Sequence, residues 1–148
     1  MLLKSNKDLE NFILNTDNYI SFLIQELSKK GFECLDKNPL HIIDDIEKFY
    51  KSYYQFYNEN DKCKLRYSFW AFFGKLLINN LGGKLQIAPK SDYCSGTPQL
   101  IDFGNRFDKK GKKKWMGIGF DSWFNGIIEN KLLGSLDGTV KHIIEYYS

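Results

Sequence analysis

The stretch LRYSFWAFFGKLLINNLGGKLQ, residues 65–86, decides the fold of this chain. Apolar side chains recur in it at the three- and four-residue spacing of a helix, and other aromatic and aliphatic residues cover most of what remains. A helix that is apolar nearly all round is a buried one. Gly82 and Gly83 are expected to end this helix, and the polar-apolar alternation of residues 84–87 predicts a strand. The stretch therefore predicts a core helix that leads directly into a sheet.

Two further helical regions are expected before the core helix. Residues 8–30 place aliphatic side chains on one side, and the Asn-Thr-Asp-Asn run at 15–18 offers a point where the helix is interrupted and starts again. An Asn-Pro pair predicts the start of a helix over residues 40–57, whose tyrosines we expect to fill the core. Asp61 is expected to cap the core helix that follows.

Three short strands are expected after the glycine pair, over residues 84–88, 98–107 and 113–120. The turn sequence Asp-Lys-Lys-Gly at 108–111 joins the last two and predicts a hairpin with lysines at its tip. The strands should form a small antiparallel sheet of about three strands.

The chain is expected to end in two helices. Asp121 or Ser122 is a suitable cap for a helix that runs to about Leu133, and Asp137 is expected to begin the last helix. The predicted architecture is a single α+β domain over residues 1–148, with N-terminal and C-terminal helices around the sheet.

Charge is distributed unevenly along this chain of 148 residues, whose formal net charge is +3. Residues 1–61 carry 7 lysines and 11 acidic residues, whereas residues 62–148 carry 14 basic and 7 acidic residues, so their net charges are −4 and +7. A protein that binds nucleic acid along its whole length needs one continuous basic face, and the uneven charge distribution argues against this function. A charged protein partner fits a bipolar molecule better.

The cysteines and the apolar segments indicate where the protein acts. Cys34, Cys63 and Cys94 are odd in number and lack the CxxC spacing of zinc sites and redox motifs, so neither a disulfide framework nor a metal site is expected. No segment resembles a signal peptide or approaches the roughly 18 uninterrupted apolar residues of a membrane span. We expect a cytoplasmic protein with no cofactor.

Candidate catalytic residues are few. His41 and His142 each lie among apolar residues of expected helices without a second ligand four residues away, so we expect ordinary, partly buried imidazoles. Cys94, in the loop Tyr-Cys-Ser-Gly, is the best placed of the cysteines for a nucleophile, and an enzyme using it with a histidine is an open alternative. The favoured interpretation is a protein without enzymatic activity.

Two charged clusters are candidates for partner binding. One cluster, on the polar side of an expected helix, consists of Asp44, Asp45 and Glu47. Two interpretations are open for it: a solvated acidic face, or a docking patch for a basic partner. The densest charge is the run DKKGKKK at 108–114, which contains Lys109, Lys110, Lys112, Lys113 and Lys114. Lysines at a hairpin tip can be merely solvated or can contact nucleic acid, with Phe107, Trp115 and Tyr93 nearby as stacking surfaces.

The segment FFGKLLINNLGGK, residues 72–84, resembles a pattern found in small bacterial immunity proteins, which are encoded beside polymorphic or contact-dependent growth-inhibition toxins. That pattern has an aromatic-Gly-Glu helix, then Leu-Gly-Gly and a Trp at the start of a strand. Here Lys75 stands in place of the Glu and Leu85 in place of the Trp. The layout of residues 46–57 and 115–128 is also similar, so the resemblance loosely covers about two thirds of the chain.

The resemblance implies that the chain binds and neutralises a cognate toxin, through the C-terminal toxin domain of that protein, by occluding its active site or substrate surface. Toxins with nuclease activity present basic clefts for phosphate, so the acidic cluster would be the natural complement of such a toxin. The lysine run would serve if the toxin surface were acidic. The alternative function is that of a nucleic-acid-binding accessory protein that uses the lysine hairpin.

Overall fold

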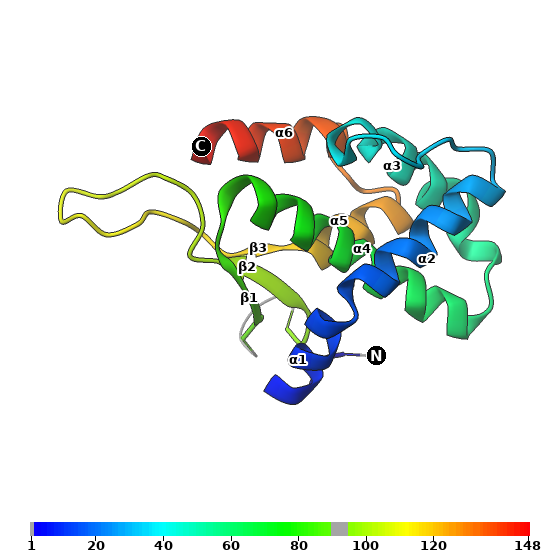
Figure 1. Cartoon of the computed structure of the whole chain (residues 1–148), viewed down its shortest axis with the longest axis horizontal. Coiled ribbons are helices and arrows are strands. Elements are labelled where there is room, and N and C mark those ends of the chain that lie inside the picture. The colour runs from blue at the N-terminus through cyan, green and yellow to red at the C-terminus, as the bar shows by residue number, and fades with distance from the viewer. Residues whose placement is uncertain (1, 90–94) are drawn as a thin grey trace.

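The computed structural model describes residues 2–89 and 95–148. Its central element is α4, Glu59–Leu81, around which the other helices and the sheet are arranged (Figure 1). Phe69, Trp70 and Phe73 of α4 are completely buried. The prediction of a buried core helix is confirmed.

The start of α4 differs from the prediction. Asn58 is the cap, because its side-chain oxygen accepts a hydrogen bond from the N–H of Asp61 at 2.8 Å. Asp61 already belongs to the first helical turn, where its negative charge suits the helix dipole. The capping role predicted for Asp61 is therefore wrong by one turn.

The N-terminal helical region is divided into α1, Asn6–Leu14, and α2, Thr16–Lys29. The break occurs at Asn15, inside the Asn-Thr-Asp-Asn run that offered an interruption. The side chain of Asn15 donates to the carbonyl oxygen of Asn11 at 2.8 Å and so satisfies the last turn of α1. The break allows α2 to pack along α4 while α1 lies beside the sheet (Figure 1).

The next helical region consists of three pieces instead of the one helix predicted over 40–57. A 3₁₀ turn at Pro39–His41 precedes α3, Ile43–Tyr53, and a second 3₁₀ turn follows at Tyr54–Phe56. Ile42 leaves the helical conformation between the first two pieces and is buried in the core. The four tyrosines of this region pack on or in the core, as predicted: Tyr50, Tyr53, Tyr54 and Tyr57.

The three described strands form one antiparallel sheet in the order β1-β2-β3. Their bounds are β1, Lys84–Ile87; β2, Pro98–Ile101; and β3, Ile118–Gly119. Leu85 pairs with Leu100, and Gln99 pairs with Gly119. The α+β class and the small antiparallel sheet are thus confirmed.

Strands β2 and β3 are shorter than the predicted ranges 98–107 and 113–120. Asp102 and Gly104 adopt positive φ values of 53° and 85°, which turn the chain out of the sheet. The two chain segments pair again only farther out, at the bridge between Phe107 and Lys113. The predicted hairpin exists, but its outer part is an arm that stands apart from the sheet (Figure 1).

Two helices complete the chain, α5 at Phe120–Ile128 and α6 at Leu136–Tyr147. Helix α5 ends before the predicted Leu133, because the carbonyl oxygen of Gly126 accepts hydrogen bonds from the N–H groups of Lys131 and Leu132 at 2.7 and 3.1 Å. Ser135 caps α6, which begins at Leu136, one residue before the Asp137 that was expected to begin it. Asp121 is buried and does not cap α5; it faces α4.

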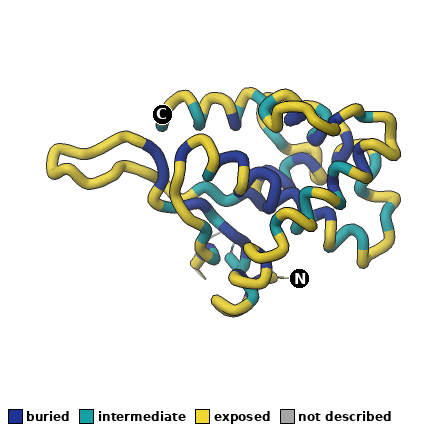
Figure 2. Tube along the Cα trace, viewed as in Figure 1, coloured by how far each residue is buried: buried dark blue, intermediate teal, exposed yellow. Residues whose placement is uncertain are grey.

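Buried residues lie mainly in the centre of the molecule, and exposed residues follow the arm between β2 and β3 (Figure 2). None of the described helices combines the length and the apolar composition that crossing a bilayer requires.

Candidate partner-binding site

The most prominent surface feature is the arm formed by residues 105–116, here called the basic arm, which projects from one end of the molecule (Figures 1 and 2). All of its residues are exposed. It contains a single acidic residue, Asp108, and six basic ones: Arg106, Lys109, Lys110, Lys112, Lys113 and Lys114.

The tip of the basic arm is closed by Asp108. Its Oδ1 accepts hydrogen bonds from the N–H groups of Lys110 and Lys112 at 2.8 and 2.9 Å, and its own N–H donates to the carbonyl oxygen of Lys112 at 2.8 Å. Gly111 supplies the positive φ of 81° that the turn needs. The one acidic side chain of the arm is therefore used to fix the turn, while the lysine side chains around it remain free to point outward.

The stem places cations and apolar side chains on both of its faces. Phe107 pairs with Lys113, and the N–H of Lys114 donates to the carbonyl oxygen of Arg106 at 2.7 Å. Since side chains two residues apart share a face, Lys113 and Trp115 lie on the face of Phe107. The opposite face carries the remaining stem residues, Arg106, Lys112, Lys114 and Met116.

The base of the arm is anchored on the C-terminal end of α6. The guanidinium of Arg106 lies 3.9 Å from the ring centre of Tyr146, and its Nε donates to the carbonyl oxygen of the same residue. The N–H of Asn105 donates to the carbonyl oxygen of Tyr147 at 2.8 Å. Last-turn carbonyl groups of a helix lack intrahelical partners, so Arg106 and Asn105 satisfy groups that would otherwise face water.

Large apolar side chains of the arm are left uncovered. Phe107 is 56% exposed and Met116 is 77% exposed. Trp115 is 38% exposed, because its ring also packs against buried Phe103 at 6.3 Å between ring centres. Rings and thioethers that stay in water on a protruding element are typical of interaction surfaces.

The lysines of the arm differ in their availability. Lys113 Nζ donates to the backbone oxygen of Asp102 at 3.3 Å and lies 3.9 Å from its carboxylate. The other four, Lys109, Lys110, Lys112 and Lys114, form no ion pair with any acidic residue in the described ranges. These four lysines are the available cations of the arm.

The acidic cluster on α3 is only partly available. Glu47 is half-buried and accepts a hydrogen bond from the N–H of Leu136 at 2.7 Å, which satisfies the first turn of α6. Asp45 is half-buried, with Oδ2 4.0 Å from Sγ of Cys34, and burial together with this carboxylate raises the pKa of the Cys34 thiol. Asp44 is exposed. Two of the three predicted partner-binding acids thus have contacts inside the protein.

The two charged clusters do not form one site. Glu47 contacts the first residue of α6, whereas the base of the basic arm contacts the last turn of the same helix. A helix of 12 residues is about 18 Å long. The acidic and basic clusters therefore lie at opposite ends of α6 (Figure 1).

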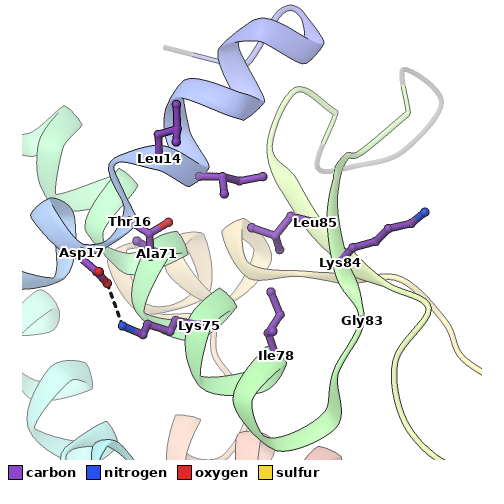
Figure 3. A pocket seen from close by; sticks show the side chains of 10 residues that line it. Leu14, Thr16, Asp17, Ala71, Lys75, Ile78, Gly83, Lys84 and Leu85 are labelled. Carbon is purple, nitrogen blue, oxygen red and sulfur yellow. Dashed lines mark hydrogen bonds and ion pairs between the residues drawn. The ribbon is translucent and has the colours of Figure 1, made fainter.

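A groove of about 500 Å³ lies between the α1–α2 junction, α4 and β1 (Figure 3). Leu14, Ile78 and Leu85 contribute apolar surface to it, and Lys84 points away from it. Lys75 Nζ and Asp17 Oδ1, 2.8 Å apart at its rim, neutralise each other. Apart from Thr16, Lys84 and this ion pair, the residues that line the groove are apolar or glycine.

The remaining candidates for chemistry are separate from one another. His41 and His142 are exposed, not partly buried as predicted, because each lies on the outer side of its helical segment. Within residues 2–89 and 95–148 no group of three His, Cys, Asp or Glu side chains is arranged to hold a metal ion. Cys94 and Tyr93 lie outside the described residues.

Sequence reasoning identified the lysines, Phe107 and Trp115 but not Arg106 and Met116. Side chains alternate between the two faces of the stem, and extending this alternation from Lys114 toward the body of the protein would have placed Met116 on the same exposed face as Lys114. The anchoring of Arg106 had no such local signal, because Tyr146 is 40 residues away in the chain.

Comparison of the chain with protein-family models, with curated proteins and with solved structures finds no match.

Proposed function

We propose that this chain is an immunity protein that binds a cognate protein toxin in the cytoplasm and neutralises it by occluding its active site or substrate surface. The observation that carries the proposal is the basic arm, an internally hydrogen-bonded element that projects from the body and leaves apolar and cationic side chains in water. Such an element presents anchors that become buried only when a partner covers them.

Charge supports a protein partner. Six basic residues and one acidic residue give the basic arm a net charge of +5, and the rest of the chain has a net charge of −2. This asymmetry orients the molecule during encounter with a charged protein. The similarity of residues 72–84 to immunity proteins adds a reason to name the partner as a toxin. Nucleases are one class of toxin that such proteins neutralise.

The test is co-expression of the tagged protein with the product of the open reading frame immediately upstream. We expect that product to arrest growth when expressed alone, and growth to resume when this chain is present. The two proteins should also co-purify at a fixed stoichiometry. A product that is harmless alone and does not co-purify would contradict the proposal.

A second candidate function is binding of single-stranded nucleic acid by the same arm. It is favoured by the position of Phe107 and Trp115 on one face of the stem, beside lysines that can contact phosphates. Fluorescence anisotropy with a labelled oligonucleotide of about 20 nucleotides tests it, since a real site loses affinity steeply as salt rises.

A further inference from the structure

We infer that the basic arm inserts into an acidic cleft of the partner protein, with its lysines against carboxylates and Phe107 and Met116 against the apolar walls. This inference rests on the proposed function and specifies the chemistry of the surface that is bound.

The charge of the arm selects an acidic surface. Lys109, Lys110 and Lys112 at the tip and Lys114 on the stem have no ion-pair partners among the described residues. The carboxylate of the tip, that of Asp108, accepts hydrogen bonds from two backbone N–H groups of the turn. The charge of the tip is therefore predominantly positive. Like charges across an interface cost several kcal/mol, so a basic surface would reject the arm.

The shape of the arm selects a concave surface. The stem pairs Arg106 with Lys114 and Phe107 with Lys113, and the turn begins after Asp108. At about 3.4 Å per residue, the two extended steps from Arg106 to Asp108 carry the turn roughly 7 Å beyond the anchor on α6. Hydrogen bonds close both the tip and the stem, and the base is held by Tyr146 and Tyr147. Because these hydrogen bonds already fix the backbone of the arm, insertion requires little additional loss of backbone conformational entropy.

The distribution of side chains favours protein over nucleic acid. A phosphate backbone is followed best by cations on one continuous face, whereas the arm carries lysines on both faces and around the tip. Met116, on the face of Lys112 and Lys114, is 77% exposed and offers a flexible apolar contact suited to a protein wall.

The acidic cluster on α3 is not equivalent to the arm as a binding site. Glu47 and Asp45 have internal contacts, which leaves Asp44 as the freely exposed carboxylate of the three. To bind the basic cleft of a phosphate-binding enzyme, this chain would need more exposed negative charge than Asp44 alone provides. The arm instead indicates a partner whose contacted cleft is itself lined by carboxylates.

The experiment measures how tightly the purified upstream product binds the wild-type chain and two double variants of it that change the net charge by the same amount. Lys110→Glu/Lys112→Glu reverses the tip and retains the backbone N–H groups that Asp108 needs. Lys7→Glu/Lys131→Glu changes net charge equally at exposed positions on α1 and after α5. We expect the tip variant to bind on the order of 100-fold more weakly and the control to stay within about 3-fold of the wild type.

A second pair tests the apolar contact. Phe107→Ala should weaken binding by about 10-fold or more, while Phe56→Ala, which removes an even more exposed ring from the 3₁₀ turn after α3, should not. Circular dichroism and thermal unfolding of all four variants establish that the body of each is folded.

The outcomes separate the inference from the proposed function. If the wild type binds and rescues growth but the tip and Phe107 variants bind equally well, the arm inference is overturned and the immunity proposal stands. If the wild type does not bind the upstream product, the proposed function fails, and the inference with it. Loss of oligonucleotide binding in the tip variant, with the protein complex unaffected, would instead assign the arm to nucleic acid.

Discussion

Arg66 of α4 donates two hydrogen bonds to the carboxylate of Asp121 of α5, from Nε to Oδ1 at 2.8 Å and from Nη2 to Oδ2 at 2.6 Å. Trp70 Nε1 donates to the same Oδ1 at 2.9 Å, and Asn125 Nδ2 donates to Oδ2 at 3.2 Å. The side chain of Asp121 is only 4% exposed. Hydrogen bonding to this carboxylate raises the pKa of Arg66 and joins the core helix to the helix that follows the sheet.

Replacement of Arg66 by Met should lower the free energy of unfolding by about 3 kcal/mol, because it leaves a buried carboxylate without its counter-charge. Urea denaturation followed by circular dichroism measures this. The matched control is Lys75→Met, which removes the exposed ion pair with Asp17 at the same short distance of 2.8 Å. That loss should stay below about 1 kcal/mol. Equal losses in the two variants would contradict a structural role for Asp121.

Gly82 and Gly83 should respond very differently to alanine. A Cβ at Gly83 would lie 2.5 Å from the carbonyl oxygen of Ile101 and 2.9 Å from Cβ of Phe103, so the end of α4 and the start of β1 would have to separate. Nothing lies within 4 Å of a Cβ at Gly82, where only backbone strain remains, at about 1–3 kcal/mol. Thermal unfolding should therefore show a clearly larger loss for Gly83→Ala, and the reverse order would contradict this packing.

Glu47→Ala should lower stability by about 1 kcal/mol, because the N–H of Leu136 loses its acceptor at the start of α6. Asp44→Ala, one turn away on the exposed side of α3, should change stability by no more than about 0.5 kcal/mol. Chemical denaturation of both variants checks the difference. Indistinguishable effects would mean that Glu47 is as free as Asp44 to serve a partner.

Glu26 should make the protein sensitive to acid. Burial acts to raise its pKa, but hydrogen bonds from Lys29 and Tyr57 outweigh burial and lower the pKa below the ordinary 4.5. A lowered folded-state pKa stabilises the fold above pH 4.5, and this contribution is lost as the pH falls through the folded-state value.

The variant Glu26→Gln tests this pH dependence. Its stability deficit relative to wild type should be constant between about pH 5 and 7 and should shrink below about pH 4.5. Denaturant unfolding at a series of pH values measures the deficit, with Asp17→Asn as an exposed acidic control on the same helix. A deficit that grows on acidification would show the opposite pKa direction.

Much of the candidate site is visible in the sequence because its signals are local. The run from Asp108 to Lys114 combines turn residues with lysines, and the closure of the tip involves residues at most four positions apart. The anchoring of the arm is different in kind. Arg106 and Asn105 meet the last turn of α6 only because the fold brings residues about 40 positions apart together.

The sequence by itself determined the core helix, its glycine end, the break near Asn15 and the basic hairpin, since each depends on periodicity or turn chemistry within a few residues. Tertiary structure alone decided that Asp121 binds Arg66, 55 residues away, and that Glu47 binds Leu136, 89 residues away. Asp121 fits a local capping pattern at the start of α5, and Glu47 fits the polar side of α3. In each case the local sequence leaves open which donor the carboxylate binds. The actual partner of the carboxylate depends on which hydrogen-bond donors are shielded from water when the helices pack together, because buried donors need an acceptor within the protein.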